Sequence, residues 1–289
     1  MRLLMFRSGS GPRLGALRPD HDDEVIELTE PSGMLELIDA GEQGLAAARA
    51  AISSGKAKSH RLSDLELLAP LGNPRGNVIA IGRNYHKHAE ETAVMDGREP
   101  SPPTIFTKAI TSLTEPFADI VIHPGISDKI DWEVELGVVI GKRGANIKRA
   151  EARAYVFGYT VINDVTARDI QSDWGGQYFK GKSLDRSAPS GPWIVTSDEV
   201  PDPQKLSLKL RVNGTVKQHG NTRDMIYPVD AVIEWVSMGM TLLPGSIIAT
   251  GTPDGVGFAR KPPEYLQHGN VMESEVESIG LLRNRIVVD

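Results

Sequence analysis

The chain has 289 residues, enough for one large domain or two unequal domains. It contains no cysteine, which excludes a disulfide scaffold, a cysteine-ligated zinc or iron–sulfur site, and a thiol nucleophile. The formal net charge is -6 and no strongly basic block occurs, so we expect neither nucleic acid nor an anionic membrane as a partner. No stretch approaches the ~20 apolar residues of a membrane span, and the apolar start is too short for a secretory signal. We therefore expect a cytoplasmic protein.

The first 72 residues are predicted to form a small N-terminal α/β domain. Short apolar runs separated by turn residues predict strands, and apolar residues at helical spacing predict a helix over Met34–Ser54 that ends at Gly55. The segment from Gly72 to Gly76 is rich in glycine and proline, which is typical of a linker. We place the boundary there, with domains at 1–72 and 73–289. The strands expected in the first part are Leu3–Phe6, Leu14–Leu17, Val25–Leu28 and Leu65–Leu68.

The remaining residues are rich in strands and carry few helices. Helices are predicted over Tyr85–Val94 and Pro228–Met238, and Asn213-Gly214 is typical of a hairpin turn. Because strands and helices do not alternate regularly, an α+β, mostly β fold is favoured over a doubly wound sheet. The expected strands are Val78–Ile81, Ile105–Lys108, Ile120–Ile122, Glu133–Ile140, Val156–Ile162, Trp193–Val195, Leu206–Val212, Ile247–Thr250, Val271–Val276 and Leu281–Val288.

Two acidic segments are candidates for a cation site. Asp131, Glu133 and Glu135 would share one face of a strand, which fits either a solvated edge or carboxylates aimed at a hard cation. Asp164 follows the end of an apolar strand, where a metal ligand or a capping residue is common. Two Glu and one Asp without cysteine or a histidine-rich motif suit Mg²⁺ or Mn²⁺ better than zinc.

Two further segments carry polar residues suited to chemistry. His88 and Glu91 are three residues apart on a predicted helix, so they form either a surface pair or a base whose imidazole is oriented by a carboxylate. Glycines surround Thr252, where backbone amides and a hydroxyl could approach an anionic ligand. A tight turn between strands is the alternative at that position.

The order of these segments resembles the fumarylacetoacetate hydrolase family. The motifs are GRNY-x-x-H-x-x-E, DWEVELGVVIG, NDVTARDIQ, GKS, TGTPDGVGF and IGLLRNRI, and they cover about residues 73 to 289. The resemblance implies a mixed β-sandwich roll, a homodimer, and one Mg²⁺ or Mn²⁺ at the mouth of the fold. It implies that the metal ligands are Glu133, Glu135 and Asp164.

The resemblance also implies the roles of the other motif residues. His88 and Glu91 match a catalytic dyad on a lid segment, and Lys182 in Gly181-Lys182-Ser183 matches a lysine that contacts the substrate enolate or carboxylate. Substrate-binding positions fall on Lys108, Arg168, Gln171 and Thr252. One departure is Ile81, because the animal tyrosine-degrading members carry a fourth carboxylate ligand at that position. This places the chain with the shorter acylpyruvase-like members and makes fumarylacetoacetate itself a doubtful substrate.

The expected activity is metal-dependent hydrolysis of a C–C bond in a 2,4-dioxo acid, which yields a 2-oxo acid and a carboxylic acid. The same chemistry would serve an oxaloacetate decarboxylase or an isomerase of 2-hydroxydienedioates, and His88 with Glu91 does not decide among them. A 2,4-diketo-3-deoxy sugar-acid hydrolase is a further alternative. In another class is a non-catalytic module that holds a structural Ca²⁺, which would need neither the dyad nor Lys182.

Overall fold

The computed structural model describes residues 1–9, 11–92 and 102–289. Within these ranges the fold is α+β with strands predominant, as predicted. The largest sheet runs in the order β4 (Ser59–Arg61), β3 (Glu24–Leu28), β2 (Gly11–Leu17), β1 (Arg2–Ser8), β14 (Ala188–Thr196), β12 (Val156–Asn163), β11 (Val134–Ile140), β17 (Ile247–Ala249), β6 (Val78–Gly82) and β7 (Thr104–Lys108). Beside this path, β5 (Leu67–Leu68) pairs with β1 and β8 (Leu113–Thr114) pairs with β14.

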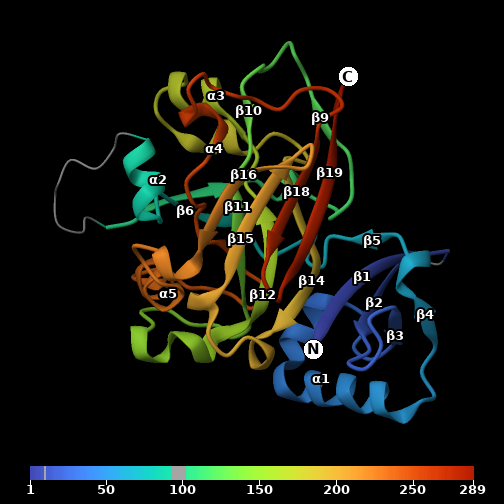
Figure 1. Ribbon diagram of the computed structural model, residues 1–289. Coiled ribbons are helices and arrows are strands. Elements are labelled where there is room, and N and C mark those ends of the chain that lie inside the picture. The colour runs from blue at the N-terminus through green and yellow to red at the C-terminus, as the bar shows by residue number, and fades with distance from the viewer. Residues whose placement is uncertain (10, 93–101) are drawn as a thin grey trace.

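A second sheet lies against the first (Figure 1). Its order is β16 (Thr215–Asn221), β15 (Ser207–Val212), β18 (Val271–Val276), β19 (Gly280–Val288) and β9 (Ile120–Ile122), and a separate short pair joins β10 (Ile130–Asp131) to β13 (Thr166–Ala167). The helices are α1 (Met34–Ser54), α2 (His86–Glu91), α3 (Arg168–Asp173), α4 (Tyr178–Lys182) and α5 (Val229–Ser237). Short 3₁₀ helices span Leu62–Asp64, Ile110–Ser112, Arg149–Tyr155, Ser197–Glu199, Pro203–Lys205, Thr222–Asp224 and Gly257–Ala259.

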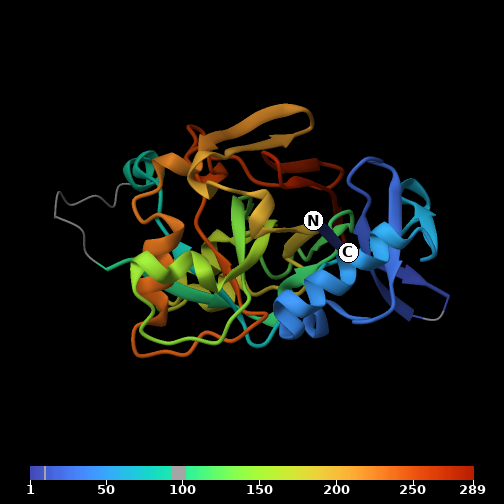
Figure 2. The same cartoon turned by 90° about the horizontal axis from the view of Figure 1, so that it is seen from below.

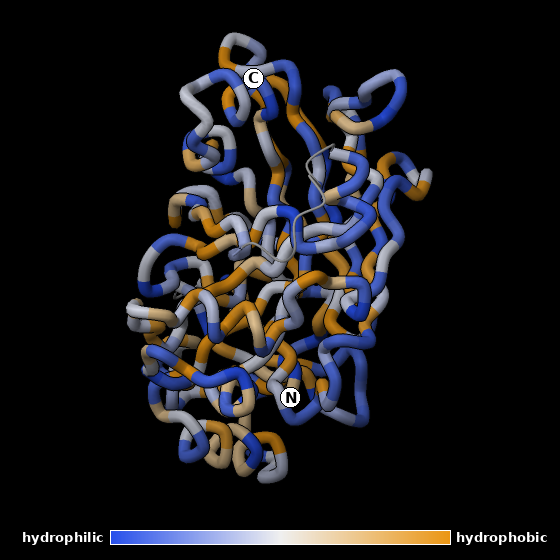
Figure 3. Tube along the Cα trace, turned by 90° about the vertical axis from the view of Figure 1, so that its left-hand side faces the viewer, coloured by the Kyte–Doolittle hydropathy of each residue, from blue (hydrophilic) through white to orange (hydrophobic). Residues whose placement is uncertain are grey.

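The burial pattern of each strand depends on whether other elements pack against one or both of its faces. Alternate residues of β15 and β18 are buried, since one face of the second sheet packs on the core and the other faces solvent. Every residue of β11 is buried, because side chains from the second sheet cover one face and residues packed with α1 cover the other. The apolar segments accordingly concentrate in the interior of the molecule (Figure 3). A fully buried central strand is a rigid support for polar groups placed at its start.

The N-terminal strands extend the main sheet. Strand β1 pairs antiparallel with β14, where Arg2 lies opposite Val195 and Leu3 opposite Ile194. The segment from β2 to β4 lies at one end of the molecule and α2 lies at the other end, in both views (Figures 1 and 2). The domain boundary at residues 72 and 73 stays a prediction. Among the described residues, no helix is long and apolar enough to cross a membrane.

Most predicted elements occur, with shifted ends. Helix α1 has the predicted bounds, whereas α2 ends at Glu91, and the rest of that predicted helix beyond residue 92 lies outside the described residues. Asn213 and Gly214 have φ values of 51° and 77°, as a tight hairpin requires, and join β15 to β16. Helices α3 and α4 were not predicted, because each is only one to two turns long.

Candidate active site

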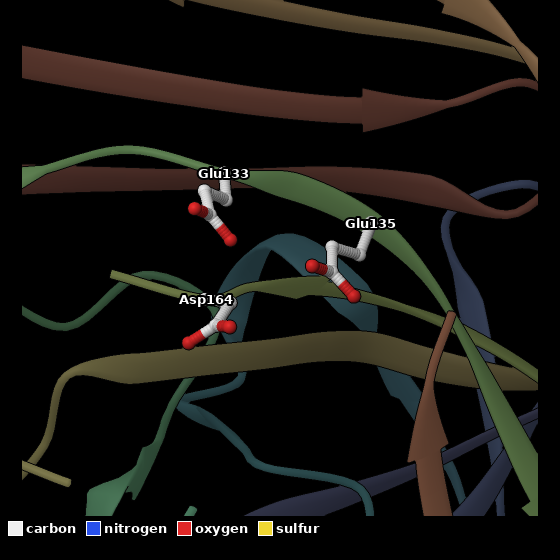
Figure 4. A group of neighbouring side chains, drawn as sticks. All are labelled: Glu133, Glu135 and Asp164. Atoms are coloured by element: carbon white, nitrogen blue, oxygen red, sulfur yellow. The ribbon is translucent and has the colours of Figure 1, made fainter. Parts of the chain in front are cut away.

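Three buried carboxylates meet beside the central strands β11 and β12 of the main sheet. Glu133 immediately precedes β11, Glu135 lies within it, and Asp164 directly follows the neighbouring strand β12. One ligand oxygen from each lies within 4.8 Å of the other two, and the three side chains point toward one another (Figure 4). The antiparallel pairing of Val134 with Asn163 sets this convergence, because it brings the start of β11 beside the end of β12.

Lysine and arginine side chains neutralise part of this charge. The Nζ of Lys182 lies 2.8 Å from Glu133 Oε2 and 2.7 Å from Asp164 Oδ2. The Nζ of Lys108 lies 2.7 Å from Asp164 Oδ1, and Arg168 Nη2 lies 2.7 Å from Glu133 Oε1. Each of these side chains is at least nine-tenths buried, so the ion pairs are poorly screened by water.

The carboxylates respond differently to this environment. Burial raises the pKa of the Glu133 carboxyl, but Lys182, Arg168 and His88 outweigh it and lower that pKa to about 2. Burial, together with the negative charges of Asp164 and Glu133, raises the pKa of Glu135 well above its ordinary value. Glu135 is therefore where negative charge is least compensated. Its Oε2 accepts a hydrogen bond from the Gly251 amide at 2.7 Å.

These residues fit a divalent cation. The ligand set consists of oxygens alone, which suits Mg²⁺ or Mn²⁺, and a cation between the carboxylates would relieve the repulsion that burdens Glu135. Each of the three carboxylates offers one oxygen to such a cation. Ile81, which the sequence resemblance marked as a departure from a fourth carboxylate ligand, lines the adjacent cavity with an apolar side chain.

His88 and Glu91 form the second part of the site. Both lie on α2, and His88 Nδ1 is 2.8 Å from Glu91 Oε1. Because a carboxylate only accepts hydrogen bonds, the hydrogen is assigned to Nδ1, and Nε2 is left as a proton acceptor. His88 is only 6 % exposed, and it lines the same cavity as Glu133 and Glu135. The surface-pair alternative for His88 is therefore excluded.

The loop after β17 ties both parts together. The Gly251 amide holds Glu135, and the Gly255 amide donates to both oxygens of Glu91, at 3.1 and 2.9 Å. Both glycines have φ near +100°, a conformation that side-chain-bearing residues rarely adopt. The hydroxyl of Thr252 in the same loop donates to the Val134 carbonyl oxygen at 2.9 Å, which anchors the loop to β11.

A cavity of about 400 Å³ opens over these groups. Of the substrate-binding residues expected from the sequence, Arg168, Gln171 and Thr252 line this cavity, as Lys182 does. Lys108 is not among the described residues that line it. It is fully buried beneath Asp164 and also donates to the carbonyl oxygens of Val165 and Lys182. Its contacts are thus with the carboxylate cluster.

Two further residues support the site in ways that the sequence did not indicate. Asp131 lies on the acidic segment, yet its fully buried carboxylate accepts from Arg168 Nε at 2.8 Å and from the amides of Gly257 and Phe258. Asn163 Oδ1 accepts from the Glu133 amide at 3.0 Å. A buried Asp or Asn beside the predicted ligands was the available signal, but sequence spacing does not reveal which groups it contacts.

Comparisons with known proteins agree with this architecture. The family described as "Fumarylacetoacetate (FAA) hydrolase C-terminal" matches residues 77–287. The human mitochondrial protein named oxaloacetate tautomerase FAHD2A is 41% identical over 295 aligned positions, which cover 99% of this chain and 92% of that protein.

Solved structures match along the whole chain. A fumarylacetoacetate hydrolase from Exiguobacterium antarcticum is 37% identical with a TM-score of 0.87, and the match covers 100% of both chains. A probable 2-hydroxyhepta-2,4-diene-1,7-dioate isomerase from Mycobacterium abscessus is 33% identical with a TM-score of 0.84, covering 100% of this chain and 99% of that one. The family match and these identities lead to one conclusion: the chain is an enzyme that belongs to the fumarylacetoacetate hydrolase family.

Proposed function

We propose that the chain is a divalent-metal-dependent oxaloacetate tautomerase, which interconverts the keto and enol forms of this 2-oxo acid. The observation that carries the proposal is that His88, oriented by Glu91, lines one cavity together with Glu133 and Glu135 of the carboxylate cluster. Similarity over nearly the whole chain to a protein named for this activity supports the choice among the chemistries open to the family.

The residues suggest how the proton moves. Mg²⁺ or Mn²⁺ held by Glu133, Glu135 and Asp164 would supply Lewis-acid stabilisation of negative charge on the 2-oxo group. His88 Nε2 takes a proton from C3 of the keto form and returns it to the oxygen on C2, so that no atom is gained or lost. Glu91 accepts the Nδ1 hydrogen bond and stabilises the imidazolium while it carries that proton. Lys182 contributes positive charge beside the enolate oxygen.

A second candidate is C–C hydrolysis of a 2,4-dioxo acid. The observation that favours it is again the His88–Glu91 pair, because a fixed imidazole base can take a proton from water as well as from carbon. The water oxygen would add to the C4 carbonyl, the C3–C4 bond would break, and C3 would be protonated. The products would be pyruvate and a carboxylic acid.

One set of assays separates these activities. The purified protein is loaded with Mg²⁺ or Mn²⁺, the ultraviolet absorbance of enol-oxaloacetate is followed, and the products are identified by NMR. Faster enol–keto interconversion with oxaloacetate preserved is the expected result. Pyruvate and CO₂ from oxaloacetate would indicate a decarboxylase, and acetate and pyruvate from acetylpyruvate would indicate the hydrolase. Metal-loaded protein that is inactive on both would contradict both candidates and favour sugar-acid or dienedioate substrates.

A further inference from the structure

Arg83 places a positive charge in the wall of the active-site cavity without a carboxylate partner in the described part of the chain. It follows β6, it is partly buried, and it lines the same cavity as His88 and Glu135. Its Nη2 donates a hydrogen bond to the phenolic oxygen of Tyr178 at 3.1 Å. Tyr178 carries no formal charge in this role, so the hydrogen bond leaves the charge of the guanidinium uncompensated.

The other cations of the cavity differ from Arg83. Lys182 is paired with Glu133 and Asp164, and Arg168 is paired with Asp131 and Glu133. Among the cavity-lining residues that the structure describes, Arg83 is thus the cation that remains for a ligand. A guanidinium has five N–H donors in a planar fork, so a single bond to a phenol leaves donors for a carboxylate.

The backbone holds Arg83 in an uncommon conformation. Its φ is 56°, in the left-handed region that residues other than glycine seldom occupy. The next residue, Asn84, is fully buried and fixes this conformation: its Nδ2 donates to the Tyr227 and Thr250 carbonyl oxygens, and its Oδ1 accepts from the Tyr227 amide. Backbone strain of this kind collects at functional sites, where the surrounding structure maintains it.

Aromatic rings form the wall beside Arg83. Tyr178 on α4 packs edge-on against Phe106 on β7, with ring centroids 5.4 Å apart. Both residues line the cavity, and the Phe106 ring also lies 5.2 Å from Lys182 Nζ. An apolar wall lowers the local polarity, which strengthens an ion pair formed there by Arg83.

From these observations we infer that Arg83 binds a second carboxylate of the substrate and so selects dicarboxylic 2-oxo acids. This second carboxylate is remote from the 2-oxo acid end, which the cation held by the carboxylate cluster would bind. The inference rests on the proposed function in taking a 2-oxo acid as the substrate. Oxaloacetate carries such a second carboxylate, whereas acetylpyruvate ends in a methyl group. Arg83 is therefore a specificity-determining residue.

A kinetic experiment compares oxaloacetate with its 4-methyl ester, which keeps the enolisable 2-oxo acid but lacks the second charge. In Arg83→Gln we expect the ratio of kcat/KM for oxaloacetate over the ester to fall about 10- to 100-fold, the range of one hydrogen-bonded charge. Arg83→Lys keeps the positive charge, so its ratio should lie between those of the native protein and Arg83→Gln. The exposed Arg143→Gln, which makes the same change of net charge away from the cavity, should leave the ratio intact.

A binding experiment tests, in the absence of turnover, whether Arg83 recognises the second carboxylate. N-oxalylglycine and N-ethyloxamate share a 2-oxo acid head and differ in a terminal carboxylate against a methyl group, and calorimetry on the Mn²⁺-loaded protein gives their Kd values. The native protein should bind N-oxalylglycine about 10-fold or more tightly, and Arg83→Gln should abolish this preference. Equal binding by the native protein, or a preference that survives in Arg83→Gln, would overturn the inference.

The two arms distinguish the inference from the proposed function. A native protein that fails to tautomerise oxaloacetate but loses its N-oxalylglycine preference in Arg83→Gln would contradict the proposed function and uphold the role of Arg83. A native protein that tautomerises oxaloacetate and its ester equally well would uphold the proposed function and contradict the role of Arg83. Thermal unfolding of each variant, compared with the native protein, shows whether an altered ratio comes from a damaged fold.

Discussion

The backbone amide of Gly255 donates to both carboxylate oxygens of Glu91, although the two residues lie 164 positions apart in the chain. Glu91 in turn accepts from His88 Nδ1, so a loop between distant strands fixes the orientation of the candidate base. The Gly251 amide of the same loop donates to one oxygen of Glu135. One loop thereby sets the geometry of the base relative to that of the carboxylate cluster.

Gly255→Ala should damage both stability and activity. Its φ is +100°, and a Cβ at this position would lie 2.2 Å from the Lys217 carbonyl oxygen, so the backbone that donates to Glu91 must shift. We expect the free energy of unfolding to fall by about 3 kcal/mol or more in denaturant titrations, with a loss of turnover. Gly239→Ala is the control, because its φ is +67° but nothing lies within 4 Å of the added Cβ, and about 1 kcal/mol is expected. Equal losses at both glycines would argue against the crowding at Gly255.

Substitutions at the carboxylate cluster and at the base should separate metal binding from chemistry. Glu135→Gln and Asp164→Asn each remove a carboxylate that we propose as a cation ligand, and we expect Mn²⁺ affinity, measured by calorimetry, to fall at least about 100-fold. His88→Ala should keep Mn²⁺ affinity near that of the native protein and lower kcat about 10²- to 10⁴-fold. Treatment with EDTA should abolish native turnover, and added Mg²⁺ or Mn²⁺ should restore it. A His88→Ala rate close to native would remove His88 from the mechanism.

Asp131→Ala should destabilise the fold although Asp131 is not a cavity-lining residue. Its carboxylate pairs with the buried guanidinium of Arg168 and accepts two backbone amides, so its removal leaves a buried charge and buried donors without partners. Breaking such a pair costs about 3–5 kcal/mol of unfolding free energy, measurable by denaturant titration. Asp128→Ala on the exposed surface should stay within about 0.5 kcal/mol. A loss below about 1 kcal/mol at Asp131 would show that water replaces these contacts.

Glu115 should contribute a pH-dependent part of the stability. Burial raises the pKa of its carboxyl, but its own backbone amide, Thr114 and Arg186 outweigh burial, so the pKa lies below the ordinary 4.5. The folded state then favours the charged form, which stabilises the protein at pH values above 4.5 and ceases to do so as the pH falls through the lowered pKa.

The corresponding variant is Glu115→Gln. At neutral pH it should be about 1 kcal/mol less stable than the native protein, and this difference should shrink as the pH drops below 4.5. Denaturant titrations between pH 3 and pH 7, on the order of one per half pH unit, measure it. Glu42→Gln on the exposed face of α1 controls for the loss of one negative charge. A difference that grows toward acid pH would reverse the assigned direction of the pKa.

Local sequence patterns predicted the elements that have strong local signals. Alternating and continuous apolar runs indicated most strands, and the helical spacing of Met34–Ser54 together with Gly55 predicted α1 with its observed bounds. Short elements were missed: α3 and α4 contain too few residues for a periodic pattern, and the packing of the chain around the cavity stabilises them. Of the three acidic residues expected to share a strand face, Glu133 and Glu135 join Asp164 in the carboxylate cluster, whereas Asp131 pairs with Arg168.

The kinds of residue at the site were also readable from the sequence. The carboxylates of Glu133, Glu135 and Asp164 predicted a hard cation, and the motifs named the family. Metal ligation, the dyad and the homodimer stay predictions that the experiments above, with a measurement of the oligomeric state, can test.

Only the tertiary structure decided which lysine and arginine side chains are paired with carboxylates and which remain available to bind a ligand. Lys108 and Lys182 are both residues that the sequence analysis assigned to the site. Lys108 is fully buried against Asp164, whereas Lys182 lines the cavity. Arg168 is neutralised by Asp131 and Glu133, whereas Arg83 faces a phenol. The sequence by itself determined the fold class and the kinds of polar residue that are available to the site, because those depend on local periodicity and residue type. Charge pairing depends on contacts between segments far apart in the chain, which exist only once β6, β11, β12 and the loop after β17 come together.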